Sequence, residues 1–271
     1  MPNNLENAVA STQGQIHSTA IIDQKSHIHH SVTVGPYCVI TGPVIIEAGT
    51  ILESHVRIQG PVTIGVGNRI YSFASLGCDP QDKKYQHELT SLVIGDFNII
   101  REYVTISRGT GHGGGITRIG SHNLFMAYVH VAHDCVIANH NTLANNASLA
   151  GHVEVGSYVG LGAFSGVHQF VRIGSYAFSG GGSIITKDIP PYMLIAGHPA
   201  KLIGLNLEGL KRQGFTKEQK KNLKECFKTL FRNSENILST AQVLLDSLTT
   251  EQEVAKPLLS FILSSIRGIT R

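Results

Sequence analysis

The stretch that decides the fold is residues 119–137, which read IGSHNLFMAYVHVAHDCVI. Every sixth position of this stretch is apolar, namely Ile119, Phe125, Val131 and Ile137. The spacing continues to Ile173, and an earlier run repeats it at eleven consecutive positions from Ile16 to Leu76. A period of six fits neither a helix nor a simply alternating strand, so it indicates an internal repeat.

A six-residue repeat is most simply built as a short strand followed by a corner. Three such hexads then complete a triangular coil of 18 residues whose apolar side chains point inward. Successive coils stack as parallel strands roughly 4.8 Å apart, and each coil buries the face that its neighbour cannot bury alone. Small or β-branched residues often stand four places after the apolar ones. The sequence therefore predicts a mainly β fold, a narrow prism of parallel strands.

Two segments interrupt the repeat. Residues 79–85 are polar and contain Pro80, and residues 108–115 read RGTGHGGG. The 18 residues from Leu76 to Ile94 keep the register across the first interruption. We interpret both segments as loops that leave the prism. The glycines of the second suit either a phosphate cradle or simple loop geometry, although no helix start or GK[ST] motif follows them.

The repeat weakens after Ile173. The prolines at 190–191 end the regular coils, and residues 194–200 are expected to remain extended. Helical periodicity then replaces the hexads. The predicted organisation is an N-terminal extension (1–15), a hexapeptide-repeat region (16–203) and a C-terminal α-helical domain (204–271).

The helical region carries its own signals. Residues 216–219, TKEQ, form a capping box. Apolar residues follow it on one helical face, at Leu223, Phe227, Leu230 and Phe231. Further helices are predicted over residues 234–248 and 249–267, the second with Pro257 near its start. We expect these helices to cover the last coil.

Composition narrows the class of protein. A hydrophobic content of 42% is enough for a core, and the four scattered cysteines suit reduced packing residues in a cytoplasmic protein. No signal peptide and no run of 18 apolar residues are found, so no membrane insertion is expected. The net charge of +3 is too small to argue for nucleic acid. From residue 200 onward, however, Lys and Arg number 12 against 7 Asp and Glu, which suits an acidic macromolecular partner.

Counting by 18 converts the repeat into a candidate site. It stacks His133, Gly151 and Gln169 in one column, and it stacks Asp134 and His152 in the next. His130 and His168 fall nearby. Because the hexad position of His133 and Asp134 is not the inward one, both side chains are expected to be exposed at a corner.

These residue types suit acid–base chemistry. A histidine beside a carboxylate is the usual composition of a general base, with an ordinary pKa near ~6.5. Gly151 offers a backbone N–H to a developing oxyanion, as acyl transfer requires. Two alternatives stay open. Zinc could be held by His130, His133 and His152, or the histidines could be turn residues of a non-catalytic scaffold, as we expect for His122 and His140.

Several motifs carry a resemblance to a known family. They are QDKKY at 81–85, AHDC at 132–135, LANNA at 143–147, LAGHV at 149–153, VHQF at 167–170 and NLEGLKR at 206–212. With these motifs the chain resembles the hexapeptide-repeat acyltransferases, in particular the branch that acylates UDP-N-acetylglucosamine at the start of lipid A biosynthesis. The resemblance implies a left-handed parallel β-helix assembled as a homotrimer.

The resemblance also implies roles for individual residues. His133 is expected to be the general base, supported by Asp134, and the Gly151 N–H is expected to bind the oxyanion. Positions that match nucleotide-sugar or pantetheine contacts are Asp82, Lys84, His130, His152, Gln169, Asn206, Glu208 and Arg212. Positions that match the acyl groove are Met126, His168 and Gly181.

The expected donor is a (3R)-3-hydroxyacyl thioester on acyl carrier protein, and the expected acceptor is the 3-hydroxyl of UDP-N-acetylglucosamine. No cofactor and no metal are implied. A rival enzyme class on the same prism is a zinc hydratase similar to the γ-type carbonic anhydrases. Acyl-chain length is not transferable, because residues 196–200 read AGHPA, with the histidine one place earlier than in the best-known family members.

Overall fold

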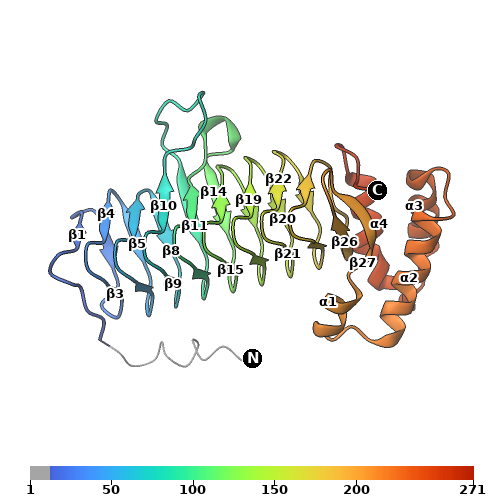
Figure 1. Ribbon diagram of the computed structural model, residues 1–271, viewed down its shortest axis with the longest axis horizontal. Helices are drawn as coiled ribbons and strands as arrows, with labels where there is room; N and C mark the ends of the chain where they lie inside the picture. The colour runs from blue at the N-terminus through green and yellow to red at the C-terminus, as the bar shows by residue number, and fades with distance from the viewer. Residues whose placement is uncertain (1–12) are drawn as a thin grey trace.

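The computed structural model describes residues 13–271, and its β region is a prism of three parallel sheets (Figure 1). Each short strand is followed by a corner, and the chain visits sheets 1, 2 and 3 in turn. Inward residues such as Ile58, Leu76 and Leu149 are fully buried. The predicted mainly β prism is therefore confirmed. Most of the predicted extension, residues 1–15, lies outside the described residues.

The strands group by sheet as follows. Sheet 1 contains β1 (Ile21–Ile22), β4 (Val39–Thr41), β7 (Arg57–Gln59), β10 (Ser75–Cys78), β13 (Thr105–Ser107), β16 (His130–Val131), β19 (Ser148–Leu149), β22 (Gly166–Val167) and β25 (Ile184–Ile185). Sheet 2 contains β2 (His27–Ile28), β5 (Val44–Ile46), β8 (Val62–Ile64), β11 (Ser91–Ile94), β14 (Ile116–Ile119), β17 (Val136–Ile137), β20 (Glu154–Val155) and β23 (Arg172–Ile173). Sheet 3 contains β3 (Thr33–Val34), β6 (Ile51–Leu52), β9 (Arg69–Ile70), β12 (Ile99–Ile100), β15 (Leu124–Phe125), β18 (Thr142–Leu143), β21 (Gly160–Leu161), β24 (Phe178–Ser179), β26 (Met193–Ala196) and β27 (Lys201–Leu205).

Register follows the 18-residue count wherever no loop intervenes. Val131 pairs with Leu149, and Leu149 pairs with Val167. Corner 1, which joins sheet 1 to sheet 2, therefore stacks residues 132–135, 150–153 and 168–171. Corner 2 joins sheet 2 to sheet 3, and corner 3 joins sheet 3 back to sheet 1.

Both predicted loops leave the prism, and both leave it at corner 1. The first occupies residues 79–90, between β10 and β11, and the second occupies residues 108–115, between β13 and β14. Leu76 pairs with Ile106, and Ile106 pairs with Val131. The loops therefore arise one and two coils below the corner that carries His133, and they rise from the same side of the prism in Figure 1.

The first loop corrects the count across it. The spacing from Leu76 to Ile94 keeps the hexad phase, but these residues lie on consecutive faces rather than one coil apart, because β10 belongs to sheet 1 and β11 to sheet 2. Ile94 instead pairs with Ile64, 30 residues earlier. The insertion thus lengthens a corner without adding a coil.

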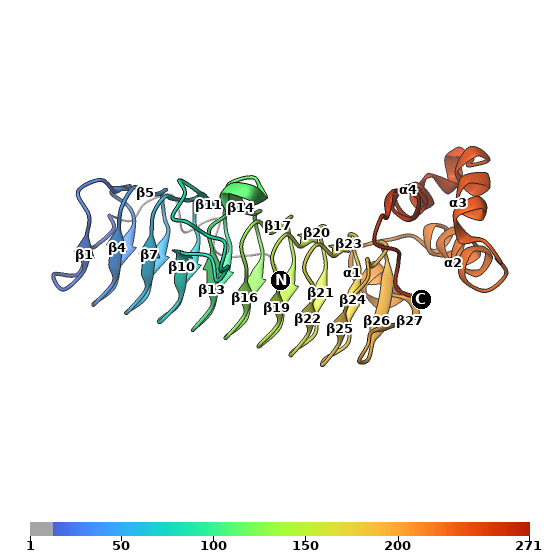
Figure 2. The same cartoon turned by 90° about the horizontal axis from the view of Figure 1, so that it is seen from above.

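The C-terminal region closes one end of the prism (Figure 2). β27 runs antiparallel to β26, so the predicted extended stretch 194–200 is wrong at residues 197–200, which turn between the two strands. The helices are α1 (Leu207–Arg212), α2 (Lys217–Phe231), α3 (Ile237–Asp246) and α4 (Lys256–Ser264), with 3-10 turns at η2 (Gly111–Gly113) and η3 (Thr250–Ala255).

The sequence signals for α2 and α4 are confirmed. The Thr216 hydroxyl accepts the Gln219 N–H, and the Gln219 side chain accepts the Thr216 N–H. Pro257 lies in the first turn of α4, where its missing N–H costs nothing. All four cysteines are free, as predicted. Within residues 13–271, no helix has the length and hydropathy of a membrane-spanning segment.

Candidate active site

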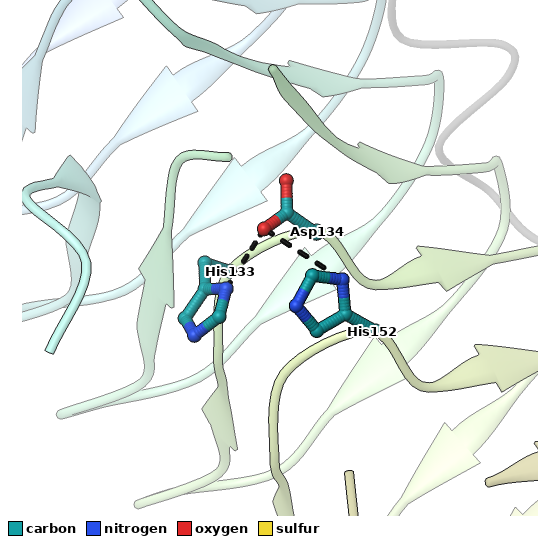
Figure 3. A group of neighbouring side chains, drawn as sticks. All are labelled: His133, Asp134 and His152. Carbon is teal, nitrogen blue, oxygen red and sulfur yellow. Dashed lines mark hydrogen bonds and ion pairs between the residues drawn. The ribbon is translucent and has the colours of Figure 1, made fainter. Parts of the chain in front are cut away.

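The corner above the two loops holds a histidine–carboxylate pair (Figure 3). His133 Nδ1 lies 2.8 Å from Asp134 Oδ2. Because an ionised carboxylate can only accept, Nδ1 carries the proton of this hydrogen bond and Nε2 is left as the acceptor. The pair thus has the arrangement of a general base that is oriented by an acid.

The expected exposure of this pair is wrong for Asp134. The Asp134 side chain is only 1% exposed, whereas that of His133 is 14% exposed. The reason is the second loop, which folds over the corner. The Thr110 N–H donates to Asp134 Oδ1 at 2.9 Å, and the Thr110 hydroxyl donates to Oδ2 at 2.6 Å. Asp134 is therefore a buried, fully hydrogen-bonded carboxylate.

The next coil places Gly151 and His152 over the pair, as counting by 18 predicts. A Cβ added to Gly151 would lie 2.6 Å from His133 Cε1, so only glycine fits against the imidazole. Among the described residues, the Gly151 N–H has no hydrogen-bond acceptor. It is available to an oxyanion beside the base.

His152 is a second imidazole at the same carboxylate. Its Nδ1 lies 3.9 Å from Asp134 Oδ2, and its ring stands edge-on to His133 at a centroid distance of 5.1 Å (Figure 3). Phe170 stacks on its other face at 4.4 Å. Burial lowers the pKa of His152 and outweighs the nearby Asp134 charge, which raises it. The environment thus favours a neutral His152.

The two loops add groups at the rim of the site. Asp82 Oδ2 lies 3.4 Å from His112 Nε2, which brings the first loop against the second. The Lys84 N–H, which donates to Asp82 Oδ1, lowers the pKa of Asp82, and His133 and His112 lower it further. Asp82 is therefore an anionic group facing the base. The Lys84 side chain is exposed on the same loop.

Other predicted residues lie around this corner. His130 is part of β16, and its Nδ1 lies 2.7 Å from the Thr105 hydroxyl. Burial lowers the pKa of His130, and His133 lowers it further. Gln169 is exposed one coil beyond Gly151. His168 is exposed beside it, and Arg267, near the C-terminus of the chain, donates to His168 Nδ1 at 2.7 Å.

Two predicted acyl-groove residues lie at a different corner. Met126 follows β15 and Gly181 precedes β25, so both belong to corner 3, across sheet 1 from His133. A Cβ added to Gly181 would come no closer than 3.4 Å to Ala163 O. The structure therefore leaves open space beside Gly181.

Asn206, Glu208 and Arg212 form a separate group at corner 2. The Asn206 side chain donates to Tyr176 O at 2.9 Å and caps α1 by accepting the Gly209 N–H. Glu208 pairs with Arg212 at 3.3 Å. All three line a cavity of about 610 Å³ with Tyr158 and Tyr176. Within a single chain, this group does not meet His133.

The zinc alternative changes its ligands. Donor atoms that lie within 4.8 Å of one another come from His133, Asp134 and His152, and His130 is not among them. In this trio the Asp134 carboxylate already accepts hydrogen bonds from Thr110 and His133. A metal would have to displace those protons.

Sequence reasoning missed the residues of the second loop. Thr110, His112 and Arg108 fall outside the hexads, so counting by 18 cannot place them. A usable signal was nevertheless present. If each loop is treated as an enlarged corner, Leu76, Ile106 and Val131 fall on one sheet, and the loops fall directly below Asp134.

Comparisons with known proteins agree with this architecture. Residues 188–270 match the family described as "Udp N-acetylglucosamine O-acyltransferase; Domain 2", and residues 116–151 match "Bacterial transferase hexapeptide (six repeats)". The acyl-[acyl-carrier-protein]--UDP-N-acetylglucosamine O-acyltransferase of Halorhodospira halophila is 48% identical over 95% of this chain and 99% of its own length. The protein of that name from Myxococcus xanthus shows the same identity and coverage.

Solved structures give the same result. The crystal structure of UDP-N-acetylglucosamine O-acyltransferase from Moraxella catarrhalis has a TM-score of 0.92 and 46% identity, over 94% of this chain and 99% of that one. The acyltransferase structure from Francisella novicida also has a TM-score of 0.92, with 40% identity over 95% and 94% of the two chains. The left-handed parallel β-helix is therefore confirmed, and the chain belongs to the UDP-N-acetylglucosamine O-acyltransferase family of hexapeptide-repeat proteins.

Proposed function

We propose that the protein transfers a (3R)-3-hydroxyacyl chain from acyl carrier protein to the 3-hydroxyl of UDP-N-acetylglucosamine, the first step of lipid A biosynthesis, in the cytoplasm. The names of its relatives, which are nearly half identical over almost their whole length, support this reaction. The observation that carries the mechanism is the 2.8 Å contact between His133 Nδ1 and buried Asp134. It leaves Nε2 as the one imidazole nitrogen able to accept a proton.

The chemistry follows from this arrangement. His133 Nε2 takes the proton of the sugar 3-hydroxyl while that oxygen attacks the thioester carbonyl. The carbonyl oxygen becomes an oxyanion and accepts the Gly151 N–H. When the tetrahedral intermediate collapses, the C–S bond breaks, and His133 returns the proton to the leaving thiolate of the carrier. Asp134 stabilises the imidazolium between the two proton transfers.

Transfer is direct, without an acyl-enzyme. The nearest thiol is that of Cys135, whose Sγ lies 3.2 Å from Ala150 O inside the prism. Burial raises the pKa of Cys135 to about 12. A thiol in that environment is not a nucleophile at neutral pH.

The remaining residues bind the two substrates. Asp82, Lys84, His130, His152 and Gln169 surround the base and contact the sugar and the pantetheine arm. The acyl chain lies along sheet 1, from His168 at corner 1 towards Met126 and Gly181 at corner 3.

The site is completed by a neighbouring protomer of a homotrimer. In support, Asn206, Glu208 and Arg212 lie at corner 2 and line their own cavity, whereas His133 lies at corner 1. Prisms packed around a threefold axis bring corner 1 of one chain beside corner 2 of the next. The nucleotide of one site is then held by the partner's copy of the Asn206 group.

The acidic carrier protein docks on the basic C-terminal region. A cavity of about 440 Å³ between α1 and α2 is lined by Lys211, Lys217, Lys220, Lys221 and Lys224. Clustered lysines of this kind favour an anionic protein partner and raise its association rate at low salt.

The test is His133→Ala, assayed with hydroxyacyl carrier protein and UDP-N-acetylglucosamine. We expect the trimer and sugar-nucleotide binding to persist while kcat falls at least ~10²–10⁴-fold, the usual contribution of a general base. His55→Asn is the matched control, because His55 stacks between Tyr37 and Phe73 on the exposed face of another corner. Full turnover by His133→Ala would refute the assignment.

Metal analysis separates the zinc alternative. Protein purified without chelator is assayed for zinc before and after His152→Ala. Stoichiometric zinc that is lost in the variant, with hydratase activity in place of thioester consumption, would replace the acyltransferase proposal.

A further inference from the structure

The second loop reaches the catalytic carboxylate through one residue, Thr110. It is fully buried, and it caps the 3-10 turn η2 that covers Asp134. Its hydroxyl oxygen accepts the Gly113 N–H at 3.1 Å. Because that N–H can only donate, the hydroxyl proton remains free for the 2.6 Å contact with Asp134 Oδ2. The hydrogen-bond count therefore commits the Thr110 proton to the carboxylate.

Asp134 has a choice of imidazoles. Its Oδ2 lies 2.8 Å from His133 Nδ1 and 3.9 Å from His152 Nδ1. A rotation of the carboxylate about its last bond would exchange one histidine for the other. The Thr110 N–H on Oδ1 and the Thr110 hydroxyl on Oδ2 hold both oxygens in place, so the carboxylate stays aligned with His133.

The loop is shaped to permit this contact. A Cβ added to Gly113 would lie 2.1 Å from Asp134 Oδ2 and 2.2 Å from its Cγ. Only glycine at this position lets the turn lie directly on the carboxylate. The Asp134 N–H is also fixed, because it donates to Thr117 Oγ1 at 2.8 Å. Backbone and side chain are thus both held from below.

We propose that Thr110 is a positioning residue of the reaction: its N–H and hydroxyl lock the Asp134 carboxylate onto His133 rather than His152. The inference rests on the proposed function, in which His133 is the general base. Thr110 touches neither substrate in this scheme and acts through Asp134. The glycine-rich loop, which as sequence alone suited a phosphate cradle or simple loop geometry, becomes an orienting clamp.

The test compares Thr110→Val with Thr110→Ser. Valine keeps the shape and the backbone N–H but removes the hydroxyl donor, and serine keeps both donors. We expect Thr110→Val to lower kcat about 10- to 100-fold, the usual loss when the partner of an orienting group is removed. The KM values of both substrates should stay within about twofold of wild type, and Thr110→Ser should restore most of the activity.

Thr90→Val is the matched control, because Thr90 is equally buried but its hydroxyl has no hydrogen-bond partner among the described residues. A double-mutant cycle adds a readout that a purely structural role would not produce. In an Asp134→Asn background, Thr110→Val should cause little further loss. Independent effects that multiply, or a serine variant as slow as the valine variant, would overturn the inference.

The outcomes also separate this inference from the proposed function. If His133→Ala is inactive and Thr110→Val has wild-type kcat, only the role of Thr110 is wrong. If His133→Ala retains full turnover, the general-base assignment itself fails.

Discussion

A single corner position shows how this scaffold changes from packing to chemistry. The residue three places after each inward apolar residue adopts a left-handed backbone conformation, as at Tyr128, Phe164 and Asp134, where φ is 65°, 58° and 59°. At other corners this position holds exposed aromatic rings, and Phe164 is 66% exposed. An aspartate tolerates the same conformation with a short polar side chain. The site therefore uses an existing backbone geometry and alters only the side chain.

The burial of His130 predicts a dependence of stability on pH. Its pKa is lowered in the folded protein, chiefly by burial and further by His133, from about 6.5 in the unfolded chain. The unfolded state therefore takes up a proton first as the pH falls. Stability is fully present above about pH 6.5 and is lost as the pH falls through the lowered folded-state pKa.

We expect His130→Asn to flatten this dependence, because asparagine does not titrate. The measurement is urea unfolding of wild type and variant at intervals from pH 7.5 to pH 5. His29→Asn serves as the control, since His29 lies in an early coil, far from this site. Parallel pH profiles for wild type and His130→Asn would contradict the interpretation.

At the residue scale, the sequence predicted neighbours better than environments. Coil counting predicted that Gly151 and His152 would lie over His133 and Asp134, because the stacking of identical coils is periodic. The burial of Asp134 was not predictable in the same way. It depends on the course of an aperiodic loop, and a hexad count contains no information about which corner that loop covers.

At the scale of elements, regular and irregular segments differ in the same manner. Strands and the capped helix α2 followed from period and capping residues. α1 was not predicted as a helix, because six residues are too few to show a helical period and its N-cap, Asn206, also bonds to the corner at Tyr176. The two loops were recognised as loops, but their contact with each other through Asp82 and His112 was not.

Arg108 fastens the first loop to the second. Its buried guanidinium donates to the Tyr85 hydroxyl and to Gly60 O, both at 3.0 Å, and pairs with Asp79. We expect Arg108→Gln to lower the free energy of unfolding by about 1–3 kcal/mol, because a carboxylate and a carbonyl lose their donor. The KM for the sugar nucleotide should rise about tenfold, with a smaller change in kcat, since the loop also carries Asp82.

The measurements for this variant are urea unfolding, steady-state kinetics and hydrogen exchange of residues 79–90. Arg101→Gln is the control, because Arg101 pairs with its neighbour Glu102 on the surface. Unchanged exchange in the loop together with an unchanged KM would show that Arg108 does not position it.

At the scale of the whole molecule, the separation of corner 1 from corner 2 makes the proposed site a shared one. We expect His133→Ala and Arg212→Ala to be nearly inactive alone and active when mixed, because a hybrid trimer can place an intact His133 beside an intact Arg212. Random assembly of equal amounts gives one intact pairing in roughly four interfaces, hence about a quarter of wild-type activity.

The two proteins are unfolded and refolded together, and specific activity is compared with that of each protein refolded separately. Mixing two His133→Ala preparations is the control. If the mixture is no more active than its components, each site is contained within one chain, and the proposed arrangement of protomers is wrong.

Because every coil has nearly the same backbone, each position in this protein is defined by two coordinates, its corner and its level along the prism. Insertions at one corner change what stands there without disturbing the levels above. Both loops have been added in this way, below a level that carries the reacting groups. New chemistry on such a scaffold thus requires only a change at one address, which is why a repetitive and structurally monotonous chain can support a precise site.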